Sequence, residues 1–136
     1  MKTLVLYYSY SGNTKKIAEE LAGKEKADIF EIKDLKRPGK FRAYTAGCFA
    51  AIRGKAWPVV PITIDIEKYD RFIILAPIWA GSPAPAFNAI LELLQLEKTI
   101  KFIMVSGSGQ SSCREKLKEF VESRGCTFEG FEDVKA

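Results

Sequence analysis

Short apolar runs that alternate with helical patterns are the feature that most limits what this chain can fold into. A strand pattern over 3–8 is followed by helical periodicity over about 14–22 and by a more polar strand pattern over about 27–33. This alternation is typical of βαβ units, which build a parallel sheet with helices on its faces. The unbroken apolar run over 71–76 supports the assignment, because such a strand is covered on both faces of its sheet.

The same alternation continues to the end of the sequence. The remaining predicted elements are a helix over 40–53, a helix from Pro85, a strand over 100–105, a helix opened by the capping box Ser112-x-x-Glu115, and a short strand over 127–131. Three glycines are expected to end helices: Gly23, Gly54 and Gly125. The 136 residues fit a single domain spanning 1–136.

The composition argues against several classes of function. Histidine is absent, which removes Ser-His-Asp and Cys-His catalysis, and Cys48, Cys113 and Cys126 form no C-x-x-C pair. We therefore expect no metal site and no catalytic residue. The net charge of +4 comes without a dense basic run interleaved with aromatics, so no nucleic-acid partner is expected. No apolar run approaches the roughly 20 residues that span a bilayer, and no signal peptide is recognisable, which predicts a cytoplasmic protein without a membrane partner.

The loop after the first predicted strand carries the strongest functional signal. It consists of Ser9, Tyr10, Ser11, Gly12, Asn13 and Thr14. Ligands of open parallel sheets bind at the carboxyl ends of the strands, and the free N–H groups at a helix N-terminus favour an anion. With its hydroxyls and its glycine, the loop predicts a cradle for one phosphate group. The alternative is a serine-rich turn in which Thr14 caps the helix.

This loop resembles the FMN-phosphate signature of the flavodoxin family, which reads hydroxyl, any residue, hydroxyl, glycine, any residue, threonine. Ser9, Ser11, Gly12 and Thr14 occupy the defined positions. The resemblance implies a flavodoxin-like α/β fold, a three-layer doubly wound sandwich around a five-stranded parallel sheet of order 2-1-3-4-5, with FMN as cofactor. It departs from the family at the end, where the final helix is missing. We expect that absence to expose apolar surface, which a second subunit in a homodimer or the C-terminal segment would cover.

The resemblance also implies that two further loops bind the flavin ring. The residues concerned are Pro77, Ile78, Trp79, Ala80 and Gly81 in one loop, and Ser106, Gly107, Ser108 and Gly109 in the other. Trp79 is the candidate for stacking on the ring, and the alternative is that it packs over the neighbouring helix. The second loop brings backbone groups to the pyrimidine edge of the flavin, or else is a flexible capped turn.

Three functions remain open on this basis. The first is electron transfer by bound FMN to or from a redox partner protein. The second is an FMN-dependent NAD(P)H:quinone-type oxidoreductase, and the third is a binding module without redox chemistry. A basic stretch could dock an acidic redox partner or the phosphate of a pyridine nucleotide, unless it is only a solvated face. It comprises Lys33, Lys36, Arg37, Lys40, Arg42, Arg53 and Lys55.

Overall fold

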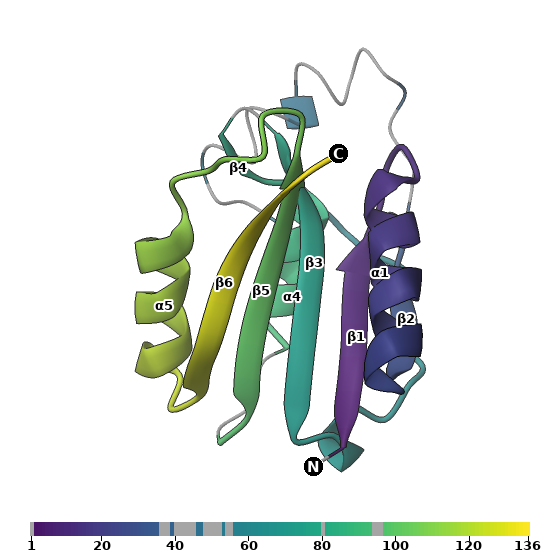
Figure 1. The fold of residues 1–136 in the computed structure, drawn as a ribbon, viewed down its shortest axis with the longest axis vertical. Coiled ribbons are helices and arrows are strands. Elements are labelled where there is room, and N and C mark those ends of the chain that lie inside the picture. Colours follow the sequence, from purple (N-terminus) through teal and green to yellow (C-terminus); the bar gives the residue numbers. More distant parts are fainter. Residues whose placement is uncertain are drawn as a thin grey trace.

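The computed structural model describes residues 2–35, 39, 46–47, 53, 56–79, 81–93 and 97–136. The predicted parallel sheet is present, in the strand order β2-β1-β3-β5-β6 (Figure 1). Its strands are β1 (Thr3–Tyr8), β2 (Asp28–Ile32), β3 (Arg71–Trp79), β5 (Thr99–Ser106) and β6 (Thr127–Lys135). The helices are α1 (Asn13–Glu25), α4 (Pro85–Leu91) and α5 (Arg114–Ser123), with a 3-10 turn at Ile66–Lys68. None of the described helices is long and apolar enough to cross a membrane.

The side chains of the central strands alternate between two cores. Leu4 and Leu6 of β1 pack in a cluster with residues of α4 and α5. Val5 between them packs in a second cluster with Ala18 and Ala22 of α1. Helices therefore cover both faces of the sheet, which explains why the central strands are apolar at successive positions.

Two helix ends differ from the prediction. The helix α1 continues through Gly23 to Glu25, and Lys26 is its C-cap residue. Lys26 has a φ of 54°, and its N–H points to the carbonyls of Ala22 and Gly23. The N–H of Ala27 also donates to Ala22 O at 2.9 Å, so the αL turn closes at Lys26 and leads directly into β2. The capping box at Ser112 is wrong as well, because Cys113 is the N-cap residue of α5 and provides no side-chain hydrogen bond. The glycine predicted to end this helix is confirmed, since Gly125 follows the C-cap with a φ of 75°.

Strands β3 and β6 are longer than predicted. β3 runs on to Trp79, so Pro77, Ile78 and Trp79 are strand residues rather than loop residues. The strand β4 (Ser82–Pro83) folds back antiparallel on this extension, with Trp79 opposite Ser82. The expected short last strand extends to Lys135, because its pairing with β5 continues to Ser106 after a register shift between Ile100 and Lys101.

Ion pairs lie over the sheet face beside α1, where apolar surface was expected. Arg71 binds Glu129 through two hydrogen bonds of 2.6 Å and contacts Glu25 at 3.4 Å. Lys101 lies 3.9 Å from Glu132. The apolar residues of this face, Ile73, Leu75 and Ile103, are buried. In the described part of the chain the exposed large hydrophobic residues are Ile29, Leu35 and Val60, none of them on β5 or β6. The expectation of exposed apolar surface here is therefore wrong.

Several sequence predictions fall on positions outside the described residues. They are most of the helix over 40–53, its end at Gly54, Cys48, the site residue Ala80, and the basic residues Lys36, Arg37, Lys40, Arg42 and Lys55.

Candidate functional site

The three predicted site segments lie at one edge of the sheet. Because β1, β3 and β5 are parallel, their carboxyl ends point the same way, and Figure 1 shows the start of α1, the β3–β4 hairpin and the loop after β5 together at the upper edge. The strand order reverses between β1 and β3, which is the switch point where such sheets bind ligands. Only the folded sheet brings these segments together, since they are far apart in the sequence.

The loop after β1 leaves the start of α1 open to an anion. Gly12 is the N-cap residue, has a φ of 101° and donates its N–H to Ser9 Oγ at 3.1 Å. No side chain caps this end, and the first turn contains no acidic residue. The predicted alternative of Thr14 as the cap is wrong, because Thr14 is the second helical residue and is buried. The free N–H groups and the helix dipole thus place positive potential at this end of α1.

Trp79 belongs to an aromatic cluster that the sequence did not reveal. Its ring contacts Tyr8, Tyr10 and Trp57 edge-on, with centroid distances of 6.2, 5.6 and 6.4 Å. Among the described residues these partners come from β1, the loop after β1 and the segment before β3, and none comes from a helix. The cluster therefore joins the β3–β4 hairpin to the loop at the start of α1. The one signal for Trp57 was that it is the only tryptophan in the sequence besides Trp79.

A second feature missed in the sequence lies beside the same loop. The Tyr8 hydroxyl donates a 2.5 Å hydrogen bond to Asp34 Oδ2, just beyond the end of β2. Tyr8, Ser9 and Asp34 help to line a cavity of about 220 Å³ between the carboxyl ends of β1 and β2. A polar residue directly after an edge strand was the available signal for Asp34. The cavity places a carboxylate and a tyrosine hydroxyl next to the helix start.

The other two segments form closed turns. Gly81 has a φ of 83° in the turn that joins Trp79 to Ser82, a conformation that favours glycine. In the loop after β5, Ser106 Oγ accepts a hydrogen bond from Gly109 N–H at 3.0 Å. A Cβ atom at Gly109 would lie 3.0 Å from Lys135 Cβ, so this turn rests on the end of β6. Gly107 and Ser108 remain exposed at the sheet edge.

Solved structures with the same architecture are flavoproteins. A flavoprotein from Lactobacillus acidophilus NCFM in complex with FMN superposes with a TM-score of 0.76 at 23% identity, over 96% of this chain and 91% of that one. The apo-form of the flavoprotein from Lactobacillus acidophilus NCFM gives a TM-score of 0.70 at 26% identity, over 97% and 92%. The two-electron reduced flavodoxin of Megasphaera elsdenii gives 0.54 at 18% identity, over 96% and 83%. No curated protein matches the chain in sequence.

One family model matches most of the chain and names the flavin. Together with the FMN complex above, it confirms three sequence predictions: the flavodoxin-like family, the doubly wound α/β fold class and FMN as the cofactor. The residues that hold the flavin remain a prediction. From its match over residues 1–128, the chain belongs to the NADPH-dependent FMN reductase family.

Proposed function

We propose that FMN binds across the three segments at the carboxyl edge of the sheet and that the bound flavin transfers electrons to or from a redox partner protein. The observation that carries this proposal is the uncapped start of α1 behind Gly12, which suits a phosphate group. Ser9, Ser11 and Thr14 supply hydroxyls, and Tyr10 and Asn13 complete the loop. FMN, when bound, supplies the electron-transfer chemistry.

The ring of the flavin would lie between the hairpin and the loop after β5. Pro77, Ile78, Trp79 and Gly81 belong to or follow the extension of β3, and Trp79 presents a half-buried indole there. An aromatic side chain of this kind can lie against a planar ring system and shield it from water. On the other side, the loop from Ser106 to Gly109 would lie at the polar edge of the ring, where the exposed residues Gly107 and Ser108 can offer backbone groups for hydrogen bonds.

The cavity at the ends of β1 and β2 lies on the side of β1 away from β3 and β5, so it borders the proposed phosphate loop rather than the path from phosphate to ring. The Asp34 carboxylate is part of its lining. The same carboxylate already holds the Tyr8 hydroxyl, whose ring contacts Trp79. The Asp34 carboxylate is therefore connected to the aromatic cluster through Tyr8.

A reductase is the second candidate, and the family match favours it. In that case NAD(P)H would reduce the flavin and a quinone-type acceptor would reoxidise it. Mixing the FMN-loaded protein with NADPH and a soluble quinone separates the two candidates. An electron carrier shows no sustained NADPH oxidation above that of free FMN, whereas a reductase turns over with a rate proportional to protein concentration.

The position of the phosphate is tested by Asn13→Asp, which adds a carboxylate to the first turn of α1. For the apo-protein we expect slightly higher stability, by about 0.3–1 kcal/mol, because the charge complements the helix dipole. For FMN we expect affinity weaker by about tenfold, because the carboxylate repels the phosphate. Riboflavin, which lacks the phosphate, should bind both proteins alike.

Ser112→Asp is the matched control, because it makes the same charge change at an exposed position just before α5. Its FMN affinity should equal that of the wild type in a fluorescence-quenching titration. Equal loss of FMN and riboflavin affinity in Asn13→Asp, or unchanged FMN affinity, would show that the phosphate does not lie at the start of α1.

A further inference from the structure

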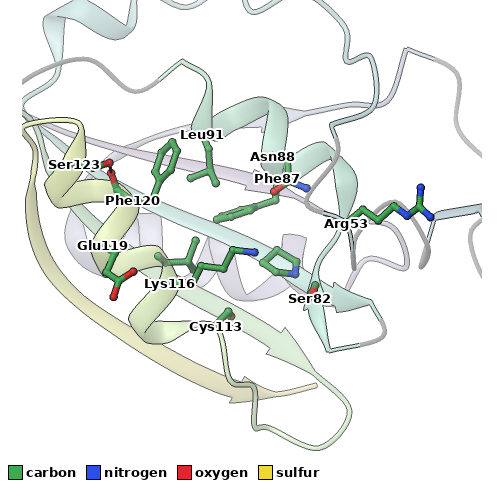
Figure 2. Close-up of a pocket in the computed structure, with 12 residues that line it drawn as sticks. Arg53, Ser82, Phe87, Asn88, Leu91, Cys113, Lys116, Glu119, Phe120 and Ser123 are labelled. Carbon is green, nitrogen blue, oxygen red and sulfur yellow. Dashed lines mark hydrogen bonds between the residues drawn. The ribbon is translucent and has the colours of Figure 1, made fainter.

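A cavity of about 550 Å³ lies between α4 and α5, on the side of the sheet opposite α1 (Figure 2). Phe87 and Leu91 of α4 form one wall, and Leu117 and Phe120 of α5 form the other. Its volume falls in the range of pockets that hold small organic molecules, about 300–1,000 Å³. None of these four residues belongs to the proposed FMN site.

The cavity lining combines apolar side chains with the ammonium group of Lys116. Figure 2 shows the side chain of Lys116 extending from α5 across the cavity beneath Phe87. Glu119 of the same helix also lines the cavity, with its carboxylate pointing away from the Lys116 ammonium. Within the described part of the chain, the Lys116 ammonium makes no hydrogen bond and no ion pair. Long lysine side chains commonly lie along apolar surface with the charged end in water, so this ammonium is available to an incoming anion.

Two further charged residues line the cavity, the cation Arg53 and the carboxylate Glu119. Asn88 of α4 adds an amide to the lining (Figure 2). Cys113, also in the lining, is buried, and burial raises the pKa of its thiol, so the thiol remains neutral at pH 7 and does not repel an anion.

From this arrangement we propose that the cavity between α4 and α5 binds a small aromatic monoanion, a carboxylate or sulfonate whose rings contact Phe87, Leu91 and Phe120 and whose charge pairs with Lys116. The ring contacts supply most of the binding free energy, because they remove apolar surface from water. The Lys116 ammonium selects the anion over neutral molecules of the same shape. The site is independent of FMN, although it reaches the β3–β4 hairpin through Ser82.

The proposal is tested with 8-anilinonaphthalene-1-sulfonate as the anionic probe and N-phenyl-1-naphthylamine as its neutral counterpart. Fluorescence titration of the FMN-loaded protein should give saturable binding of one sulfonate per chain. Lys116→Gln should lower the affinity for the sulfonate about fivefold, as expected for an ion pair near the surface. The affinity for the neutral probe should stay within about twofold of the wild-type value. Lys118→Gln, a lysine on the same helix that does not line the cavity, should behave as the wild type.

Two further measurements test where the sulfonate binds and how its affinity depends on charge. Amide resonances of α4 and α5 should shift on adding the sulfonate, whereas those of residues 9–14 should not. Raising the salt concentration should lower the affinity for the sulfonate more in the wild type than in Lys116→Gln, because salt screens the charge of Lys116.

Three outcomes would overturn the proposal. They are equal sulfonate affinity in the wild type and Lys116→Gln, displacement of the sulfonate by FMN, and loss of sulfonate binding as the protein dimerises, which would make a second copy the occupant. If FMN fails to bind while the sulfonate still selects Lys116, only the proposed function is wrong.

Discussion

At the scale of single residues, Gly47 lies so close to the rings of Trp79 and Trp57 that a side chain at this position would contact them. A Cβ atom at position 47 would lie 2.6 Å from Cζ3 of Trp79 and 3.2 Å from Cη2 of Trp57. No real Cβ contact is as short as the first of these, so one of the rings would have to move. Position 47 is buried, and its contact therefore belongs to the packing that holds the Trp79 ring in the aromatic cluster.

Replacing Gly47 with alanine should displace Trp79. We expect a loss of about 1–3 kcal/mol in the free energy of unfolding, typical of overpacking a buried site, and a shift of the tryptophan emission maximum in the folded protein. Gly39→Ala is the matched control, because a Cβ atom there has no neighbour within 4 Å. If both variants show wild-type emission and stability, Gly47 does not position the indole.

At the scale of elements, Arg71 ties β3 to β6 and α1. Two hydrogen bonds of 2.6 Å join its guanidinium to Glu129 on β6, and a third contact of 3.4 Å reaches Glu25 at the end of α1. These contacts lower the pKa of Glu129 below its usual range, with the hydrogen bonds from Arg71 as the main cause. Such two-pronged pairs are stronger and more directional than ordinary surface ion pairs.

We expect Arg71→Ala to lower the free energy of unfolding by about 1–2 kcal/mol at pH 7, a modest value because solvent reaches Glu129 and screens the pair. Since the folded protein lowers the pKa of Glu129, the stabilisation is complete above the usual pKa of a glutamate and is lost as the pH falls through the lowered value. Urea unfolding at pH 7 and near pH 2 measures the difference.

The exposed pair between Arg114 and Glu115 serves as the control for that measurement. Its side chains are 51% and 73% exposed, so Arg114→Ala should change stability by less than about 0.5 kcal/mol at either pH. A deficit in Arg71→Ala that is the same at pH 7 and at low pH would mean that lost packing, rather than the charge pair, causes it.

At the scale of the whole molecule, the two outer strands are protected in different ways. The polypeptide just beyond β2 is paired, because Val60 N–H donates to Lys33 O at 2.8 Å and Leu35 N–H to Pro58 O at 3.1 Å. The strand β6 carries a register shift and several charged residues instead, both of which discourage pairing with another chain. The predicted homodimer therefore gains no support from the β5–β6 face.

Charge reversal at Lys101 tests that conclusion. Lys101 lies on β5 within this face, so an interface there would be disrupted by Lys101→Glu opposite Glu132. We expect the sedimentation coefficient at low micromolar concentration to be the same for both proteins. A wild type that sediments as a dimer and a variant that sediments as a monomer would place the interface on this face after all.

The sequence by itself determined the order of the described elements and the doubly wound fold and located the loop predicted to bind phosphate, because each depends on local patterns. Apolar periodicity marks strands and helices, and the loop at 9–14 is contiguous. Helix ends and strand lengths were less certain, since the closing turn at Lys26 and the pairing of charged β6 depend on neighbours that are distant in sequence.

Only the tertiary structure decided which side chains surround the site. The Tyr8 hydroxyl binds Asp34, and the Trp79 ring contacts the rings of Tyr8 and Trp57. The contacts of Tyr8 arise because β1 lies between β2 and β3 in the sheet. The ion pairs that replace apolar surface beside α1, and the cavity that brings Lys116 against the residues of α4, are likewise contacts between elements. Such contacts leave no periodic pattern in a sequence, because each partner alone resembles an ordinary surface residue.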